Sequence, residues 1–293
     1  MRILLFLATN MAVLVLVSIV FNLLGLEGIL AANGVDLNLK SLLIFCALFG
    51  FGGSLISLLL SKWMAKRGTG THIITTPANR DEQWLVDTVR ELAEEAGIGM
   101  PEVGIFPSEA ANAFATGWNR NDALVAVSAG LLQRFRPEEV RAVMAHEIGH
   151  VANGDMITLT LIQGVINTFV MFFARIIGHT VDRLVFKTER GYGLGYYAVT
   201  IVAELVLAFL ASMIVFWFSR WREYRADAAG AALTTNAHMI AALQRLRAEQ
   251  NLPQDLPGEL TAFGISEQLK QGVAGLLRSH PPLEERIRAL QSA

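Results

Sequence analysis

Four long apolar segments constrain the fold of this chain more than any other feature of its sequence. They cover residues 3–26, 39–60, 156–178 and 194–218. A helix needs about 20 apolar residues to cross the hydrocarbon core of a bilayer, and each segment has that length. The chain is also 53% hydrophobic and only 17% charged, which is too apolar for an ordinary soluble protein. We therefore expect a mainly α integral membrane protein with about four transmembrane helices.

The four segments predict membrane spans with different strength. Segment 3–26 is too long for the apolar part of a cleaved signal peptide, and segment 39–60 follows it at once, so we expect an uncleaved hairpin. Segment 194–218 carries Glu204 near its middle. This residue indicates a polar contact inside the helix bundle, a role in substrate passage, or a protonated carboxyl group without chemistry. Segments 156–178 and 194–218 either cross the bilayer fully or form a hairpin that is partly embedded.

Basic residues at the segment ends predict the orientation of the chain. Three of them follow the second segment and three follow the fourth: Lys62, Lys66, Arg67, Arg220, Arg222 and Arg225. Cytoplasmic flanks of membrane spans are enriched in Lys and Arg, so we expect the polar sequence after each hairpin to lie in the cytoplasm. The loop between the third and fourth segments is also basic, which departs from this rule.

The polar sequence predicts one α+β domain with a small β-sheet, interrupted by a membrane hairpin. We expect an N-terminal hairpin at 1–62, the first part of the domain at 63–155, a second hairpin at 156–218 and the rest of the domain at 219–293. A net charge of −2 argues against a nucleic-acid partner. The one cysteine, Cys46, excludes a disulfide within the chain and a zinc site built from cysteines.

Local signals outline the elements of the first polar piece. Apolar spacing predicts a helix over 81–96, and short β-type runs predict strands at 102–106, 112–116 and 123–127, the last two as a hairpin. A further helix starts at Ser128. The next helix begins at Pro137 and ends at Asn153-Gly154, because proline is favoured in a first turn and glycine after a last turn.

The helix that begins at Pro137 carries the pattern H-E-x-x-H. His146 and His150 lie one turn apart on one face, so both can bind the same ion. Neutral imidazoles suit Zn²⁺, and a catalytic zinc site has three protein ligands and an open water position. Glu147 lies about 100° around the helix from His146, so it can act as general base without displacing a ligand.

The sequence offers a third ligand beyond the second hairpin. Glu223 and Asp227 lie one turn apart in a helix-type stretch, and we expect Glu223 to bind the zinc and Asp227 to hold the free ring N–H of a zinc histidine. The alternative is a solvated helix of alternating charge. The 73 residues between His150 and Glu223 (223 − 150) are almost entirely the second hairpin, which returns the chain to the same side of the membrane.

These motifs together resemble the HtpX-type membrane zinc metalloproteases. The resemblance is carried by "HEIGH", by the E-x-x-x-D of Glu223 and Asp227, by "NAFATG", and by "RSHPPLEERI" near the C-terminus, and it covers nearly the whole chain. That family comprises bacterial heat-shock, quality-control proteases related to the CAAX prenyl endopeptidases. The resemblance implies a zincin-like domain, of the gluzincin type, in the cytoplasm and one zinc ion per chain.

Two further roles follow from the resemblance alone. His280 in "SHPPL" is implied as a donor that stabilises the oxyanion during peptide hydrolysis. Asn112, Ala113 and Phe114 are implied as part of an edge strand that pairs with the substrate backbone.

The sequence therefore predicts a zinc endopeptidase of the bacterial inner membrane. Its expected partners are the lipid bilayer and membrane proteins or unfolded polypeptides as substrates. One rival hypothesis is a prenyl-protein-type endopeptidase with the same chemistry. Another is a membrane scaffold with a structural metal, which would need a fourth protein ligand.

Overall fold

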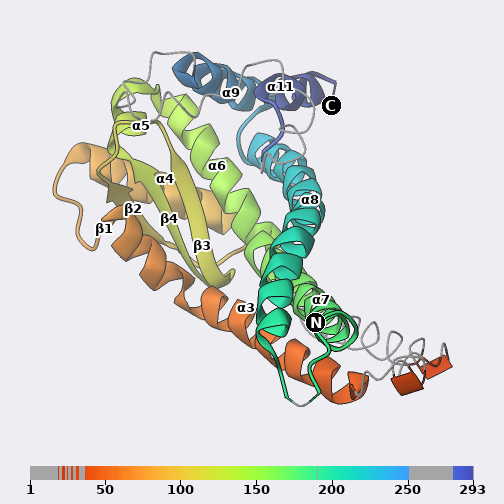
Figure 1. Ribbon diagram of the computed structural model, residues 1–293. Coiled ribbons are helices and arrows are strands. Elements are labelled where there is room, and N and C mark those ends of the chain that lie inside the picture. The colour runs from red at the N-terminus through yellow and green to blue at the C-terminus, as the bar shows by residue number, and fades with distance from the viewer. Residues whose placement is uncertain are drawn as a thin grey trace, which may run out of the picture. The chain divides into compact units, whose positions relative to one another are not determined.

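The computed structural model describes residues 37–189, 191–250 and 280–292, together with a few scattered positions before residue 37. The chain divides into two compact units (Figure 1). The first contains Met1–Ser57 and Leu159–Val215, and the second contains Leu58–Thr158 and Phe216–Ala293.

Among the described residues, three helices are long and apolar enough to cross a membrane. They are α3 (Leu39–Thr69), α7 (Asp155–Leu184) and α8 (Leu194–Leu233). The predicted spans 39–60, 156–178 and 194–218 lie inside these helices, whereas span 3–26 lies largely outside the described residues. At 40 residues, α8 is about 60 Å long, so the fourth apolar segment and the stretch with Glu223 form one continuous helix.

Inside the first unit, the carboxylate of Glu204 is paired with an arginine. Glu204 Oε1 lies 3.0 Å from Nη1 of Arg175 on α7. The guanidinium of Arg175 also lies over the ring of Phe45 on α3, 5.6 Å from its centroid. The structure thus places Glu204 in a polar contact inside the helix bundle. A charge at membrane depth is expected to be paired in this way.

The connection between α7 and α8 is held by one buried carboxylate. Asp182 accepts hydrogen bonds from the hydroxyl of Thr188 and from the backbone N–H groups of Gly193 and Tyr196, at 3.0, 3.0 and 3.1 Å. These bonds join the last turn of α7 to the first turn of α8, so the two helices form a closed hairpin.

The second unit is built around a four-stranded sheet. Its strands are β1 (His72–Ile73), β2 (Glu102–Phe106), β3 (Ala113–Asn119) and β4 (Asp122–Ser128), in the order β1-β2-β4-β3. Strands β2 and β4 are parallel, and β3 and β4 form an antiparallel hairpin, which confirms the predicted hairpin. Strand β1 was not predicted, because two residues carry no periodic pattern.

Helices cover the sheet and complete the core of the second unit (Figure 1). They are α4 (Arg80–Glu95), α5 (Ala129–Arg134), α6 (Pro137–Asn153), α9 (Asn236–Gln250) and α11 (Leu283–Gln291). Side chains from α4, β4, α6 and α9 share one buried cluster, which includes Leu85, Val125, Met144, Ile148 and Leu243. The helices predicted to start near Asp81, at Ser128 and at Pro137 are confirmed, with boundaries shifted by a residue.

Local chemistry fixes both ends of α6, the helix that carries H-E-x-x-H. Pro137 occupies the first turn, and the carboxylate of Glu139 accepts a 2.9 Å hydrogen bond from the backbone N–H of Arg136. At the other end, Gly154 adopts a left-handed conformation with φ 70° and ψ 30°. A residue with a side chain is strained there, so glycine allows α6 to stop and α7 to begin at Asp155.

Candidate metal centre

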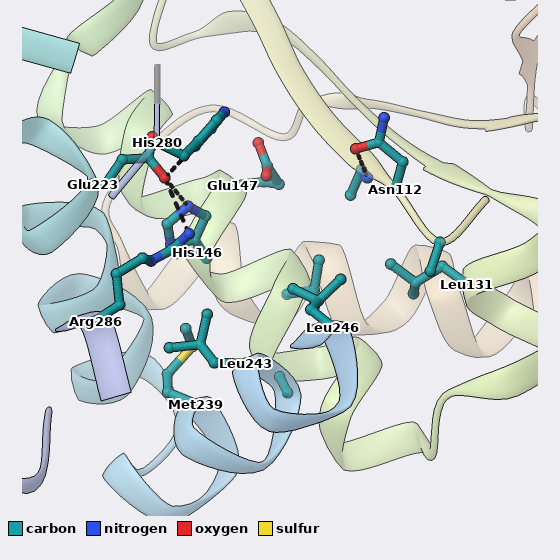
Figure 2. Close-up of a pocket in the computed structure, with 14 residues that line it drawn as sticks. Asn112, Leu131, His146, Glu147, Glu223, Met239, Leu243, Leu246, His280 and Arg286 are labelled. Carbon is teal, nitrogen blue, oxygen red and sulfur yellow. Dashed lines mark hydrogen bonds and ion pairs between the residues drawn. The ribbon is translucent and has the colours of Figure 1, made fainter. Parts of the chain in front are cut away.

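Helices α6 and α8 bring three ligand-type side chains to one point. His146 and His150 lie one turn apart on α6, and Glu223 lies on α8. Their ligand atoms all lie within 4.8 Å of one another, and Figure 2 shows two of these side chains, His146 and Glu223, at one end of a cavity. Glu223 is 0% exposed, and both histidines are buried.

The spacing of these atoms fits a single metal ion. His150 Nε2 lies 3.3 Å from Glu223 Oε1, and His146 Nε2 lies 3.6 Å from Glu223 Oε2. Two ligand atoms that each lie about 2.1 Å from one tetrahedral zinc ion are about 3.4 Å apart. Both oxygens of Glu223 are buried, and their neighbours among the described residues are cationic or imidazole nitrogens: those of His146, His150, His280 and Arg286. Buried carboxylate oxygens need a partner, and a cation at this point supplies one.

Each histidine is oriented by its own aspartate. His146 Nδ1 lies 2.9 Å from Asp227 Oδ1, and His150 Nδ1 lies 2.8 Å from Asp155 Oδ2. A carboxylate on Nδ1 fixes the tautomer that leaves Nε2 free for a metal. The structure thus places Asp227 beside His146, and it places Asp155, for which the sequence had suggested no role, beside His150.

The surrounding carboxylates favour positive charge on the two imidazoles. Burial lowers the pKa of a histidine, but Asp155 and Glu223 outweigh this effect and raise the pKa of His150 to about 9. Burial is likewise outweighed by Asp227 and Glu223, which raise the pKa of His146. Burial also raises the pKa of a carboxyl group, yet the neighbouring imidazoles hold the pKa of Glu223 far below its usual range. The site is therefore suited to a cation, whether protons or a metal ion.

The C-terminal residues add two side chains to the site. His280 Nδ1 lies 2.8 Å from Glu223 Oε2, and its side chain is 61% exposed. Arg286 on α11 is buried and contacts both Asp227 and Glu223. Arg286 stands six residues after His280 in the stretch "SHPPLEERI", but no spacing rule connects it to the H-E-x-x-H helix.

A cavity of about 130 Å³ opens beside the metal ligands (Figure 2). Glu147, which is partly exposed, lines it together with His146 and His280. The other walls come from β3 and from helices α5, α6 and α9, and most of their side chains are apolar: Ala111, Ala113, Leu131, Val143, Met239, Leu243 and Leu246. The cavity can accept a medium-sized apolar side chain next to Glu147.

The start of β3 lies on the same cavity. Asn112 and Ala113 line it, whereas Phe114 packs its ring against Phe106, with centroids 5.4 Å apart. Asn112 O accepts a 2.9 Å hydrogen bond from Ser128 N, so the backbone of Asn112 faces β4. Residues of an antiparallel strand alternate, so the N–H and C=O groups of Ala113 and Ala115 face away from β4. Within the described residues β3 pairs only with β4, so this edge is free.

Comparison with known proteins gives relatives along the whole chain. Residues 79–293 match the profile of peptidase family M48. The chain is 70% identical over 291 residues to Protease HtpX of Pseudomonas putida (strain W619), with 99% of each chain covered. It is 68% identical over 291 residues to Protease HtpX of Pseudomonas syringae pv. tomato (strain ATCC BAA-871 / DC3000), again with 99% of each covered.

A solved structure is similar in fold. It is the crystal structure of S. mikatae Ste24p, which superposes with a TM-score of 0.63 at 19% sequence identity. The match covers 94% of this chain and 66% of that chain. At this level of identity the likeness concerns the fold alone.

Proposed function

The chain belongs to peptidase family M48 and is a membrane metalloendopeptidase, and from this premise we propose that it uses one zinc ion to hydrolyse misfolded or surplus membrane proteins. The proposed ligands are His146, His150 and Glu223. The observation that carries this proposal is the convergence of their ligand atoms, with two imidazole nitrogens facing one fully buried carboxylate.

Glu147 is the proposed general base and acid. A bound zinc ion lowers the pKa of water and polarises a carbonyl group. Glu147 follows the ligand His146 directly and lines the cavity, so its carboxylate reaches a water molecule or a leaving group there. It accepts the proton of the attacking water and returns that proton to the leaving amine.

His280 is the proposed donor to the oxyanion. In the structure its Nδ1 faces Glu223 Oε2 at 2.8 Å. The oxyanion role requires the imidazole to turn from Glu223 toward the cavity. Its side chain is 61% exposed and lines that cavity, so it has room to turn.

The free edge of β3 is the proposed binding site for the substrate backbone. The outward N–H of Ala113 donates a 2.9 Å hydrogen bond to Oδ1 of Asn112, so a side-chain carbonyl occupies the place that a substrate carbonyl would take. The substrate then extends the sheet by one strand, and the Asn112 side chain is released to contact it. The backbone of this strand therefore matters more than the side chain of Phe114.

Chain connectivity supports membrane proteins as substrates. His150 stands five residues before α7 begins at Asp155, and Glu223 stands five residues after the predicted span 194–218 ends. Both ligands are thus close, along the chain, to segments that can cross the bilayer. With the basic flanks of these segments, we place the protease unit at the cytoplasmic face of the bacterial inner membrane.

The scaffold hypothesis is less favoured by the site. A closed structural zinc site needs four protein ligands, as a rule. In the part of the chain that the structure describes, no fourth His, Cys, Asp or Glu joins the three convergent side chains. A cavity that Glu147 lines lies beside these side chains, and a bound zinc ion would share it with a water molecule or substrate.

The test is cleavage by wild type and by Glu147→Gln, both purified in detergent with zinc and given an unfolded membrane protein or casein. We expect the substitution to reduce cleavage by a factor of about 100 or more while zinc content stays at one per chain, because it removes the base but no ligand. Glu138→Gln, an exposed change on the same helix, is the matched control. Undiminished cleavage by Glu147→Gln would refute the mechanism, and unchanged zinc content in Glu223→Ala would refute the third ligand.

A further inference from the structure

A buried arginine of the C-terminal helix contacts two acidic side chains of the metal site, Asp227 and Glu223. Figure 2 shows the arginine, Arg286, and one of the two acids, Glu223. Arg286 lies on α11 and is 6% exposed. Its Nη2 and Nε donate hydrogen bonds of 2.6 and 2.8 Å to the two carboxylate oxygens of Asp227. Its Nη1 lies 3.3 Å from Oε2 of Glu223. One guanidinium group thus contacts both a proposed ligand and the residue that orients His146.

We propose that Arg286 is a positioning residue that holds Glu223 and Asp227 in place and, through Asp227, sets the orientation of His146. This inference rests on the zinc site proposed above. Oδ1 of Asp227 is shared, because it lies 2.6 Å from Arg286 Nη2 and 2.9 Å from His146 Nδ1. A displaced Asp227 would release the histidine ring as well. Only the planar fork of arginine satisfies both oxygens of Asp227 while it reaches Glu223.

The charges around the site give a second reason for a buried arginine. Four carboxylates surround the two histidines: Glu147, Asp155, Glu223 and Asp227. Four negative charges and one divalent ion leave a net charge of −2, and the guanidinium reduces it to −1. Negative charge without a partner is unfavourable in a buried site, and the guanidinium of Arg286 offsets part of it at 2.6–3.3 Å from Asp227 and Glu223.

Other contacts hold α11 in place without Arg286. Ile287 and Leu290 are buried in the main core of the second unit. The hydroxyl of Tyr224 on α8 donates to Glu285 at 3.3 Å, and the amide of Asn236 on α9 donates to the backbone carbonyl of Leu290 at 3.3 Å. Substitution of Arg286 is therefore expected to disturb the site before it releases the helix.

The test measures metal retention rather than activity. Arg286→Lys keeps the positive charge but loses the planar guanidinium group that contacts both oxygens of Asp227. Arg286→Met loses the charge and the guanidinium group. We expect zinc transfer to a chromogenic chelator to be faster than in wild type by about 10-fold in Arg286→Lys and about 100-fold in Arg286→Met. The absorption spectrum of the cobalt-substituted protein should change in both, because His146 is no longer held in one orientation. Arg288→Met, an exposed change on the same helix, should leave both measurements unaltered.

A double variant tests the route through Asp227. In an Asp227→Asn background, Arg286→Met should add clearly less to the rate of zinc release than it does in wild type, about 10-fold or less, since its effect through Asp227 is already removed and only its contact with Glu223 is left. This double variant also removes both charges of the pair, so it remains informative if Arg286→Met alone does not fold. Wild-type release rates and cobalt spectra in the two single variants would overturn the proposal, as would a full additional effect in the double variant. A wild type that binds no zinc would refute the zinc site itself, and this inference with it.

Discussion

Zinc binding at the proposed site should depend steeply on pH, because His150 must lose a proton before it can bind the ion. Asp155 and Glu223 raise the pKa of His150 to about 9, so its imidazole is protonated at neutral pH in the metal-free protein. Protons therefore compete with zinc at every pH below that value. Each pH unit below 9 lowers the apparent affinity for zinc about ten-fold. From pH 9 to pH 7 we therefore expect the affinity to fall about 100-fold, or by about 3 kcal/mol of binding free energy, from His150 alone.

The substitution Asp155→Asn isolates the cause of this pH dependence. Asparagine keeps the size and the acceptor oxygen of Asp155 but removes its charge, so the pKa of His150 should fall toward the ordinary value for histidine. The affinity of the variant should then rise less steeply between pH 7 and pH 9 than that of wild type, because only His146 still has a raised pKa. At pH 9, where protons no longer compete, the variant should bind zinc about 10–100-fold more weakly than wild type, because His150 is less well oriented.

The assay is competition for zinc against a chromogenic chelator of known pH dependence, from pH 6.5 to pH 9.5, in detergent. Glu138→Gln on the same helix removes an exposed carboxylate and should behave as wild type. A wild-type affinity that does not change between pH 7 and pH 9 would refute the raised pKa of His150. An equally steep dependence in Asp155→Asn would refute Asp155 as its cause.

Three further outcomes are expected. The pKa of His150 is raised to about 9 in the folded protein. The metal-free protein should therefore have its full stabilisation below about pH 6.5 and lose about 3 kcal/mol of unfolding free energy as the pH rises through 9. Hydrogen exchange of the α6 amides should show this loss in metal-free protein and no such loss in zinc-loaded protein. Leu246→Ala should widen the apolar cavity and shift the cleavage preference in a peptide library by about 10-fold toward larger apolar side chains. An unchanged preference would show that this cavity does not select the substrate. Arg175→Met should leave Glu204 unpaired and destabilise the first unit by about 3 kcal/mol. The double variant Arg175→Met/Glu204→Gln should recover most of this stability. Equal melting temperatures of the single and double variants in detergent would contradict the pairing.

The elements that the sequence predicted are those whose signals are local. The ends of α6 follow from Pro137 at its start and from Gly154 after its last residue. The β3–β4 hairpin follows from two β-type runs separated by turn residues. Helix α9 was not predicted, although Met239, Ala242 and Leu243 stand at helical spacing and pack in the core. Its apolar residues include an unbroken run from Met239 to Leu243, so no single face stands out in the sequence, and only the tertiary contacts show which of them pack in the core.

The side chains that the sequence did not assign are those brought in by a turn or by a distant helix. In a continuous helix Asp155 would lie about 140° around the axis from His150, away from the metal face. The left-handed Gly154 ends α6 and redirects the chain, which places Asp155 Oδ2 2.8 Å from His150 Nδ1. Arg286 arrives on α11, 136 residues after His150 (286 − 150), and no periodicity links residues so far apart.

The two variable positions of "HEIGH" are also explained by the packing of α6 against α8. One face of α8 carries the two acids of the site, Glu223 and Asp227, and two small residues at helical spacing from them, Ala226 and Gly230. A Cβ atom on Gly149 would lie 3.0 Å from Ala229 Cβ and 3.2 Å from Ala226 O, and one on Gly230 would lie 3.1 Å from His146 N. Ile148, in turn, is fully buried in the core on the other side of α6. The distance between packed helices depends on the side chains at their contact, so small residues here let α6 and α8 approach closely enough to share one ion. Gly149 is thus required by the metal site, although it supplies no ligand.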